Sequence, residues 1–311
     1  MASRHEKESL SMTSRAGELE IPMVGFGTYQ MSSEEAKEAV AIALAAGYRH
    51  IDTAEGYRNE VGVGEAIYAA NIPRESLFIT TKLFPGFSKW GQQVKGREET
   101  LQACKNSLER LKLEYVDLYL IHAPAVNKED RLTQWRTLLE LQGQGLVKHI
   151  GVSNYDVRHL KEIGDEGLPQ PAVNQIEVHP MCMQKQVRAY MDEKGCTTVA
   201  YSSLVPLASW REDKDGDQTR SSRLVNASSL EQIARAHNVS QAQVLLRWAL
   251  QHHLVILPKS ISETRIHENR DLFAFHLTDE EMTTMDNMDL QQPMAWQSSG
   301  IDPMQTDSML A

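Results

Sequence analysis

Short hydrophobic runs rich in β-branched residues recur along the chain, separated by segments with apolar positions every three or four residues. The first pattern is typical of buried strands and the second of amphipathic helices. The runs predict eight strands, at residues 24–27, 48–51, 77–81, 116–121, 147–152, 172–177, 197–201 and 254–257. Strict alternation with helices indicates parallel strands joined by crossover helices. Eight such units predict an α/β fold, a (β/α)8 TIM barrel that forms one domain over residues 11–290.

Several helix ends carry clear signals. Ser32 and Glu35 form a capping box before "EEAKEAVAIALAA", and Gly47 is placed to stop that helix. "ASSLEQIARAHN" and "SQAQVLLRWALQ" predict two late helices, and Thr278 with Glu281 predicts the start of another.

The segments outside the repeating units have less pattern. Residues 1–10 are polar and expected to be disordered, and "SMTSRAGELEIP" predicts an N-terminal hairpin that turns at Ala16-Gly17. The charged stretch 210–226 is too long for a simple connector, so it is either a functional flap or a mobile loop. We expect extended loops at the C-terminal face of the barrel, with the tail 291–311 near the substrate pocket.

Composition narrows the class of protein. A net charge of −10 argues against general affinity for nucleic acid or anionic membranes. Three cysteines without a CxxC pair favour neither disulfides nor a metal site, and they indicate a reducing compartment. The first residues have no apolar core of a signal peptide, and 18 apolar residues never occur in a row. We therefore expect a cytoplasmic protein, and the lack of heptads favours a monomer.

Polar or ionisable residues lie at seven of the eight predicted strand ends, where barrels of this kind place their chemistry. These residues are Asp52, Tyr57, Lys82, His122, Ser153, Asn154, Gln175, Ser202, Lys259 and Ser260.

Four of these residues form a plausible proton-transfer group. A tyrosine hydroxyl is a weak acid, and Lys82 nearby would lower the pKa of Tyr57. Asp52 would hold the lysine and offset the cost of burying its charge. His122 would orient a carbonyl oxygen. Such a site protonates a carbonyl oxygen while hydride reaches the carbon.

The hydride requires a cofactor, because side chains do not supply it. No GxGxxG follows a strand, and Gly62 and Gly64 lie inside a helical pattern, where we expect them to pack. "LPKSISETRIHEN" instead places Lys259, Ser260 and Arg265 around a helix start, a suitable cage for a phosphate. This favours the 2′-phosphate of NADPH.

The chain closely resembles the aldo-keto reductases. Matching stretches run in order from about residue 21 to 290: "GFGTY", "AGYRHIDTAEGYRNE", "LFITTKL", "LEYVDLYLIHAP", "HIGVSNY", "VNQIEVHP", "AYSSL" and "LPKSISETRIHEN". The resemblance implies a barrel that reduces aldehydes or ketones without metal, using NADPH in preference to NADH. The family's catalytic tetrad falls on Asp52, Tyr57, Lys82 and His122.

The resemblance also implies cofactor contacts. Amide contacts to the nicotinamide fall on Ser153, Asn154 and Gln175, and Tyr201 matches the aromatic residue that stacks on its ring. The remaining matches are Gly27, Thr28 and Tyr29 in "GFGTY", Ser202 and Leu204 beside the pyrophosphate, and Lys259, Ser260, Arg265, Glu268 and Asn269 at the adenosine end.

The substrate pocket departs from the family pattern. Phe84 and Ala123 stand where many relatives have tryptophan, as does Tyr29, which predicts a wider pocket. Phe87 and Trp90 either line it or cover the barrel. Sugar aldehydes, methylglyoxal, lipid aldehydes and ketones all remain open as substrates.

Some residues have simpler interpretations. His50 and His179 fit buried structural histidines, His252-His253 fits a surface transition, and the three cysteines fit core packing. Asp117 is either a partner of the strand-end network or a structural acceptor. A second functional hypothesis is an NADPH-binding regulatory subunit with weak or no turnover.

Overall fold

The computed structural model describes residues 11–13, 19–207, 227–291, 293–296 and 302–305. The predictions for residues 1–10, for the turn at Ala16-Gly17 and for the stretch 210–226 lie outside these described residues.

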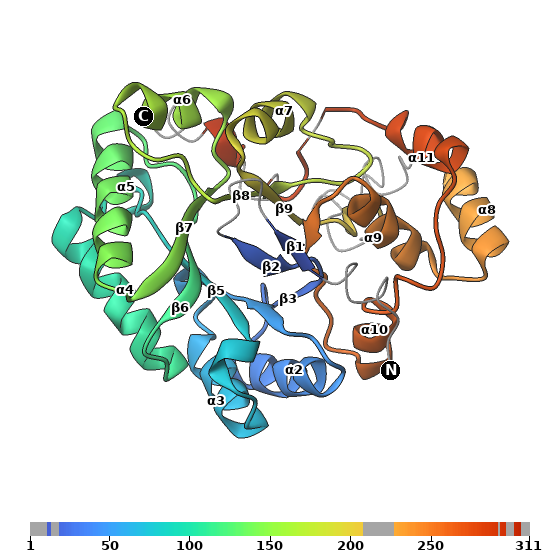
Figure 1. Ribbon diagram of the computed structural model, residues 1–311, viewed down its shortest axis with the longest axis horizontal. Coiled ribbons are helices and arrows are strands. Elements are labelled where there is room, and N and C mark those ends of the chain that lie inside the picture. The colour runs from blue at the N-terminus through green and yellow to red at the C-terminus, as the bar shows by residue number, and fades with distance from the viewer. Residues whose placement is uncertain (1–10, 14–18, 208–226, 292, 297–301, 306–311) are drawn as a thin grey trace.

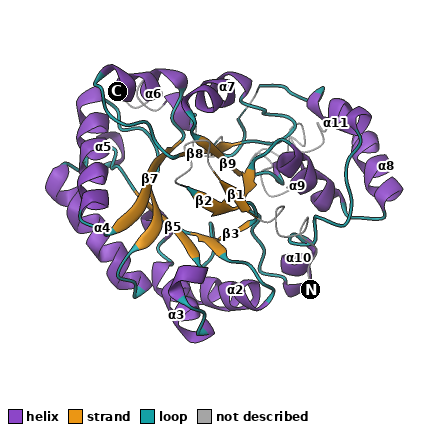
Figure 2. Ribbon diagram, viewed as in Figure 1, coloured by secondary structure: helices purple, strands orange, loops and turns teal. Residues whose placement is uncertain are grey.

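Eight parallel strands form the centre of the molecule, and helices surround them (Figures 1 and 2). The strands pair with their neighbours in chain order: β3 (Gly25–Gly27), β4 (His50–Asp52), β5 (Phe78–Leu83), β6 (Val116–Ile121), β7 (Val147–Ser153), β8 (Val173–Glu177), β9 (Thr197–Tyr201) and β10 (Val255–Ile256). A parallel bridge between Val24 and Ile256 joins the last strand to the first. The sheet therefore closes on itself, and the predicted (β/α)8 barrel is confirmed.

The helices pack against the outside of the strands. They are α2 (Ser33–Ala45), α3 (Glu60–Ala70), α4 (Arg97–Leu111), α5 (Lys128–Gly143), α6 (Val157–Asp165), α7 (Lys185–Lys194), α8 (Ala227–His237), α9 (Gln241–Gln251), α10 (Glu263–Glu268) and α11 (Asp279–Asp286). The capping boxes predicted at Ser32 and Thr278 are both present. Gly47 follows α2 with a φ of 93°, a left-handed conformation that suits glycine.

Two glycines of α3 are packing residues, as predicted. A Cβ on Gly62 would lie 1.8 Å from the carbonyl oxygen of Ser33, and one on Gly64 would lie 2.6 Å from that of Leu111. No side chain fits at these distances, so α3 can approach α2 and the end of α4 closely.

A two-stranded hairpin lies at the amino end of the barrel, as predicted. Its strands β1 (Ser11–Thr13) and β2 (Glu20–Pro22) pair with Met12 opposite Ile21. Leu19 and Ile21 are buried in the barrel interior against a cluster that includes Phe78 and Leu118. Burial of these side chains stabilises the closed end and leaves the other end free for a site.

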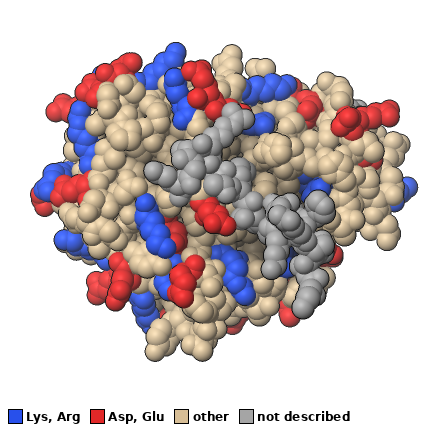
Figure 3. All heavy atoms as spheres, in the orientation of Figure 1, with Lys and Arg blue, Asp and Glu red and all other residues tan. Residues whose placement is uncertain are grey.

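Two strands extend beyond their predicted ends. β5 continues to Leu83, paired with Ile121 of β6, and β4 ends on Asp52 itself. Lys82 and Asp52 therefore lie within strands, where the ladder of backbone hydrogen bonds fixes their positions. Figure 3 shows that charges of both signs are interspersed over the visible face.

Candidate active site

A cavity of about 400 Å³ opens at the carboxyl ends of the strands. We call it the barrel-mouth cavity. It is lined by Gly27, Tyr29, Gln30, Asp52, Gly56, Tyr57, Phe84, His122, Ser153, Asn154, Gln175, Tyr201, Ser202, Ser203, Leu204, Val205, Leu257, Pro258, Lys259, Ala295 and Trp296. Its size falls within the range of small-molecule sites in proteins.

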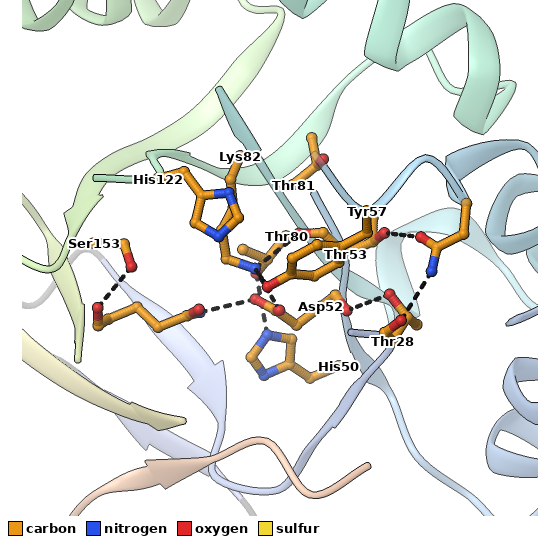
Figure 4. A network of polar contacts seen from close by, with 12 residues as sticks. Thr28, His50, Asp52, Thr53, Tyr57, Thr80, Thr81, Lys82, His122 and Ser153 are labelled. Carbon is orange, nitrogen blue, oxygen red and sulfur yellow. Dashed lines mark hydrogen bonds and ion pairs between the residues drawn. The ribbon is translucent and has the colours of Figure 1, made fainter. Parts of the chain in front are cut away.

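The ammonium group of Lys82 lies beneath this cavity, and the side chain is fully buried. Its Nζ donates to Asp52 Oδ1 at 2.5 Å, to the carbonyl oxygen of Thr53 at 2.8 Å and to the hydroxyl of Tyr57 at 3.4 Å (Figure 4). All three partners come from the end of β4 and the turn that follows. The buried cation therefore has a carboxylate and two further acceptors, which offset its desolvation.

The pKa of Tyr57 departs from the sequence-based expectation. We expected Lys82 to lower it, but burial and the negative charge of Asp52 raise it well above its usual value. The positive charge of Lys82 does not offset this rise, because its Nζ lies 2.5 Å from Asp52 but 3.4 Å from the hydroxyl of Tyr57. Burial also lowers the pKa of Lys82, although Asp52 opposes that effect. Tyr57 therefore carries its proton at neutral pH.

His122 lies beside Tyr57, with ring centroids 5.4 Å apart in an edge-to-face arrangement. Burial lowers the pKa of His122 well below its usual value, and the positive charge of Lys82 adds to this effect. Its Nδ1 is buried and has no hydrogen-bond partner in the part of the chain that the structure describes. His122 is therefore neutral, and a neutral imidazole can donate a hydrogen bond to a carbonyl oxygen while the phenol of Tyr57 keeps its proton.

The turn that carries Tyr57 is fixed by a buried asparagine. Residues Glu55–Tyr57 form a short 3-10 helix, after which Arg58 takes a left-handed conformation. Asn59 accepts from the hydroxyl of Thr53 at 2.9 Å and donates to the carbonyl oxygen of Thr28 at 2.8 Å. These bonds hold the turn against the end of β3. Asn59 lies in the stretch "GYRNE", but no sequence pattern indicated this role.

A second polar network extends from Asp52 across the cavity. Gln175 Nε2 donates to Asp52 Oδ2 at 2.8 Å, and the backbone oxygen of Gln175 accepts from the hydroxyl of Ser153 at 2.8 Å. Asn154 Nδ2 donates to the carbonyl oxygen of His122 at 3.0 Å. Tyr201 donates to Asn154 Oδ1 at 2.7 Å. Four predicted cofactor residues are thus connected, directly or through one another, to Asp52 and His122 of the tetrad.

Trp296 is a lining residue that the sequence analysis did not single out. Its indole Nε1 donates to the hydroxyl of Tyr201 at 3.2 Å. Glu177, at the end of β8, accepts from the backbone nitrogens of Met294 and Ala295 at 2.7 and 2.9 Å. The carboxylate thus holds the chain that places Trp296 over the cavity. The tail has no periodicity, so no sequence pattern indicated which residue would reach the site.

The predicted site residues separate into two groups. The tetrad lines or underlies the cavity, and so do most of the predicted cofactor residues. Thr28 is buried, with its hydroxyl on the backbone oxygen of Asp52 at 3.1 Å. The predicted residues that are absent from the lining are Thr28, Lys82, Ser260, Arg265, Glu268, Asn269, Ala123, Phe87 and Trp90.

Three residues that were expected to line the substrate pocket do not line the cavity. Phe87 and Ala123 are fully buried and cluster together behind Phe84. Trp90 packs edge-to-face on Phe87, with ring centroids 5.0 Å apart. Phe84 therefore separates the cavity from this aromatic cluster.

The residues predicted to bind the adenosine end of the cofactor lie within α10 or directly beside it in the chain. Ser260 is buried, and its Oγ accepts from the backbone nitrogen of Ser262 at 3.0 Å. Arg265 is exposed, whereas Asn269 is buried at the end of the helix. Lys259 is exposed and also lines the cavity, so the cavity reaches from the tetrad to this region.

The cavity wall also has polar groups that are open to a ligand. Ser203 lines the cavity with a buried hydroxyl that has no hydrogen-bond partner among the described residues. An unpaired buried hydroxyl is costly unless a ligand satisfies it. Together with the ammonium of Lys259, it fits a polar ligand with phosphate groups, and NADP(H) is such a ligand.

His50 and His179 are buried and each contacts a neighbouring side chain, which agrees with the structural role expected for them. His50 contacts Thr80 Oγ1 at 3.1 Å, and burial lowers its pKa to about 4. His179 contacts Glu177 at 3.0 Å, and His252 contacts Asp286 at 2.8 Å.

Asp117 and the cysteines lie outside the site. Asp117 accepts from the backbone nitrogen of Ile79 at 2.8 Å near the amino end of β6, so it is a structural acceptor. Cys104, Cys182 and Cys196 are buried free thiols. Within the described ranges, no three His, Cys, Asp or Glu side chains are grouped to hold a metal ion. Nor does any helix there have the length and apolar character needed to cross a bilayer.

The chain is similar to known proteins over most of its length. The sequence model of the Aldo/keto reductase family matches residues 23–290. A glyoxal reductase of Bacillus subtilis is 42% identical over 269 residues, which cover 86% of this chain and 89% of that protein. A methylglyoxal reductase of Escherichia coli is 37% identical over 86% of this chain and 90% of its own.

Solved structures agree with this similarity. The crystal structure of a Bombyx mori aldo-keto reductase in complex with NADP superposes with a TM-score of 0.81 at 32% identity, over 92% of this chain and 96% of that one. An aldo/keto reductase from Brucella melitensis superposes with a TM-score of 0.78 at 38% identity, over 90% and 99%.

Proposed function

The chain belongs to the aldo/keto reductase family, and we propose that it reduces aldehydes or ketones to alcohols with NADPH as hydride donor and Tyr57 as proton donor. The observation that carries this proposal is the contact of Lys82 with both Asp52 and Tyr57 beneath the barrel-mouth cavity, with His122 beside them. Such a group serves proton transfer to an oxygen held at the cavity floor.

The tetrad residues have separate tasks. Tyr57 holds a proton at neutral pH because burial raises its pKa, so the acid is loaded before substrate binds. When the carbonyl oxygen gains negative charge, Tyr57 donates that proton, and Lys82 stabilises the phenolate that remains. His122 stays neutral because its pKa is lowered, and it positions the oxygen by a hydrogen bond.

NADPH, when bound, supplies the hydride that the carbonyl carbon receives. We propose that Asn154, Ser153 and Gln175 hold its amide end and that Tyr201 stacks on its ring. Gly27, Thr28 and Tyr29 are proposed to contact it on the β3 side, and Ser202 and Leu204 are proposed to flank the pyrophosphate. The adenosine end is assigned to Lys259, Ser260, Arg265, Glu268 and Asn269.

The preference for NADPH over NADH rests on two cations. Lys259 and Arg265 are both exposed and lie on either side of Ser260 in the chain, and two cations together with a hydroxyl suit a phosphate monoester. NADH has no phosphate at this position, so it would gain little from them.

Small 2-oxoaldehydes are the first substrates to examine. The relatives named above are reductases of glyoxal and methylglyoxal, and the cavity is bounded by Phe84, Tyr29 and Trp296. Aromatic walls exclude water and leave the carbonyl as the polar part of the ligand. We further propose that the protein works as a monomer in the cytoplasm, where its three buried thiols stay reduced.

The test is to incubate the protein with NADPH and glyoxal, methylglyoxal or 4-nitrobenzaldehyde, and to measure the consumption of NADPH from its absorbance. The proposal predicts turnover with at least one of them and formation of the corresponding alcohol. Tight NADPH binding without turnover on any carbonyl would contradict it and would favour a regulatory subunit of the same fold.

A further inference from the structure

The turn that carries Tyr57 and the loop that begins at Phe84 share one carboxylate. Glu55 Oε2 accepts from the backbone nitrogen of Phe84 at 3.0 Å and from Lys95 Nζ at 3.2 Å. Lys95 Nζ also donates to the carbonyl oxygen of Phe84 at 2.6 Å. Glu55 and Lys95 therefore bind both backbone polar groups of Phe84. We call this arrangement the Glu55–Lys95 clamp.

The loop between Phe84 and Lys95 is itself closed at its base. The backbone nitrogen of Lys95 donates to the carbonyl oxygen of Pro85 at 2.9 Å. Gln134 of α5 donates to the carbonyl oxygen of Lys95 at 3.0 Å. Gly86 has a φ of 81°, and a Cβ there would lie 1.9 Å from the carbonyl oxygen of Gln93. The loop thus folds tightly on itself, and the hydrogen bonds of Glu55 connect it to the turn that carries Tyr57.

The clamp fixes a wall of the barrel-mouth cavity. The ring of Phe84 lines the cavity and meets His122 edge-to-face, with centroids 6.3 Å apart. A Cβ on Gly56 would lie 3.4 Å from Phe84 Cδ2 and 3.8 Å from His122 Nδ1. The space beside His122 therefore depends on where the Phe84 ring sits relative to Gly56.

From these contacts we propose that Glu55 is a positioning residue that sets the width of the carbonyl pocket, by holding Phe84 against the turn of Tyr57. This inference rests on the proposed carbonyl reduction. Glu55 is adjacent to Gly56 and two residues before Tyr57, so one carboxylate couples the proton donor to the pocket wall. Loss of the clamp lets Phe84 move without altering the tetrad. That movement weakens the binding of bulky substrates, which contact Phe84, and leaves the binding of small ones unchanged.

The first experiment compares kinetic constants in Glu55→Ala, Glu55→Gln and Lys95→Met with those of the wild type. Loss of the clamp raises the KM for 4-nitrobenzaldehyde about five-fold or more, the effect of losing roughly one hydrogen bond. The KM for glyoxal and the Kd for NADPH stay within about two-fold of the wild-type values. Glu55→Gln gives a smaller effect because its amide oxygen still accepts from Phe84.

Glu98→Gln is the matched control. Glu98 is an exposed carboxylate near the start of α4 that pairs with Arg97, away from the cavity. The control removes one negative charge but leaves Phe84 untouched, so both KM values remain those of the wild type.

The second experiment measures backbone hydrogen exchange in residues 84–95. Glu55→Ala and Lys95→Met accelerate exchange in this segment relative to the wild type, while exchange in β8 is unchanged. Unchanged exchange, or equal changes in KM for both aldehydes, would overturn the inference.

The two proposals fail in different ways. A wild-type protein that reduces no carbonyl contradicts the proposed function, and the specificity role of Glu55 falls with it. An active enzyme whose KM values do not change in the Glu55 and Lys95 variants contradicts only the proposed role of the clamp.

Discussion

The ammonium nitrogen of Lys82 lies 3.4 Å from the hydroxyl oxygen of Tyr57. The same nitrogen is only 2.5 Å from Asp52, so in the resting enzyme it interacts more strongly with that carboxylate than with Tyr57. The contact with Tyr57 can strengthen when a phenolate forms, since charge then develops on the hydroxyl oxygen. Lys82 thus acts on the transition state more than on the resting tyrosine.

Replacing Lys82 tests this arrangement in both stability and rate. Lys82→Met leaves Asp52 buried with Gln175 but without a cation, which should cost about 3–5 kcal/mol in the free energy of unfolding. Denaturant unfolding measures that loss. Carbonyl reduction should fall with it, because no cation remains to stabilise the phenolate.

The double variant Lys82→Met/Asp52→Asn separates the two effects. It removes both charges, so the free energy of unfolding should recover part of the loss, while the reduction rate stays low. Wild-type stability in the single variant, or recovered activity in the double variant, would contradict this account of the pair.

His50 should make the protein less stable in mild acid. Its pKa is about 4 in the folded protein but near 6.5 when unfolded, so the unfolded chain binds the proton first as pH falls. The free energy of unfolding should therefore fall by about 1.3 kcal/mol from this residue between pH 7.5 and 5.5. Urea unfolding of His50→Gln at both pH values should show that much less loss than the wild type. An identical loss in both proteins would show that His50 does not titrate in this way.

Trp296 lines the cavity, and its hydrogen bond to Tyr201 fixes its ring, so it should influence substrate binding. Trp296→Phe keeps an apolar ring but removes the donor to the Tyr201 hydroxyl. Loss of one hydrogen bond predicts a rise of about two- to ten-fold in KM for an aldehyde. Steady-state kinetics measures this value, and a fluorescence titration should show little change in NADPH affinity. A large loss of NADPH affinity with unchanged KM would assign Trp296 to the cofactor instead.

Arg265 should discriminate between the two nicotinamide cofactors. If it meets the 2′-phosphate, Arg265→Ala should weaken NADPH binding about 10- to 100-fold and change NADH binding by less than about two-fold. Arg265→Lys should lie between, because a lysine keeps the charge but not the forked donors. Equal losses for both cofactors would place the 2′-phosphate elsewhere.

The barrel and its reactive floor could be predicted because their signals are local. Strand runs, capping boxes and polar strand ends each depend on a few neighbouring residues, and parallel pairing brings Asp52, Lys82 and His122 to one end of the barrel. The pKa of Tyr57 could not be predicted in direction, because it depends on burial and on relative distances that no sequence pattern records.

The pocket walls were harder for the same reason. Ala123 and Phe87 lie next to the right motifs in the chain, but the side chain of Phe84 stands between them and the cavity. Trp296 reaches the cavity because Glu177 binds the backbone of a tail that comes more than a hundred residues later. Such contacts depend on tertiary packing and not on spacing.

The most direct test of the proposed chemistry is the rate of NADPH oxidation by Tyr57→Phe with 4-nitrobenzaldehyde. This variant keeps the ring and loses only the hydroxyl that donates the proton, so the reduction rate should fall at least about 100-fold, as expected for a lost general acid. The affinity for NADPH should stay within about two-fold of the wild-type value. A Tyr57→Phe protein that reduces the aldehyde at the wild-type rate would contradict the assignment of Tyr57 as the proton donor.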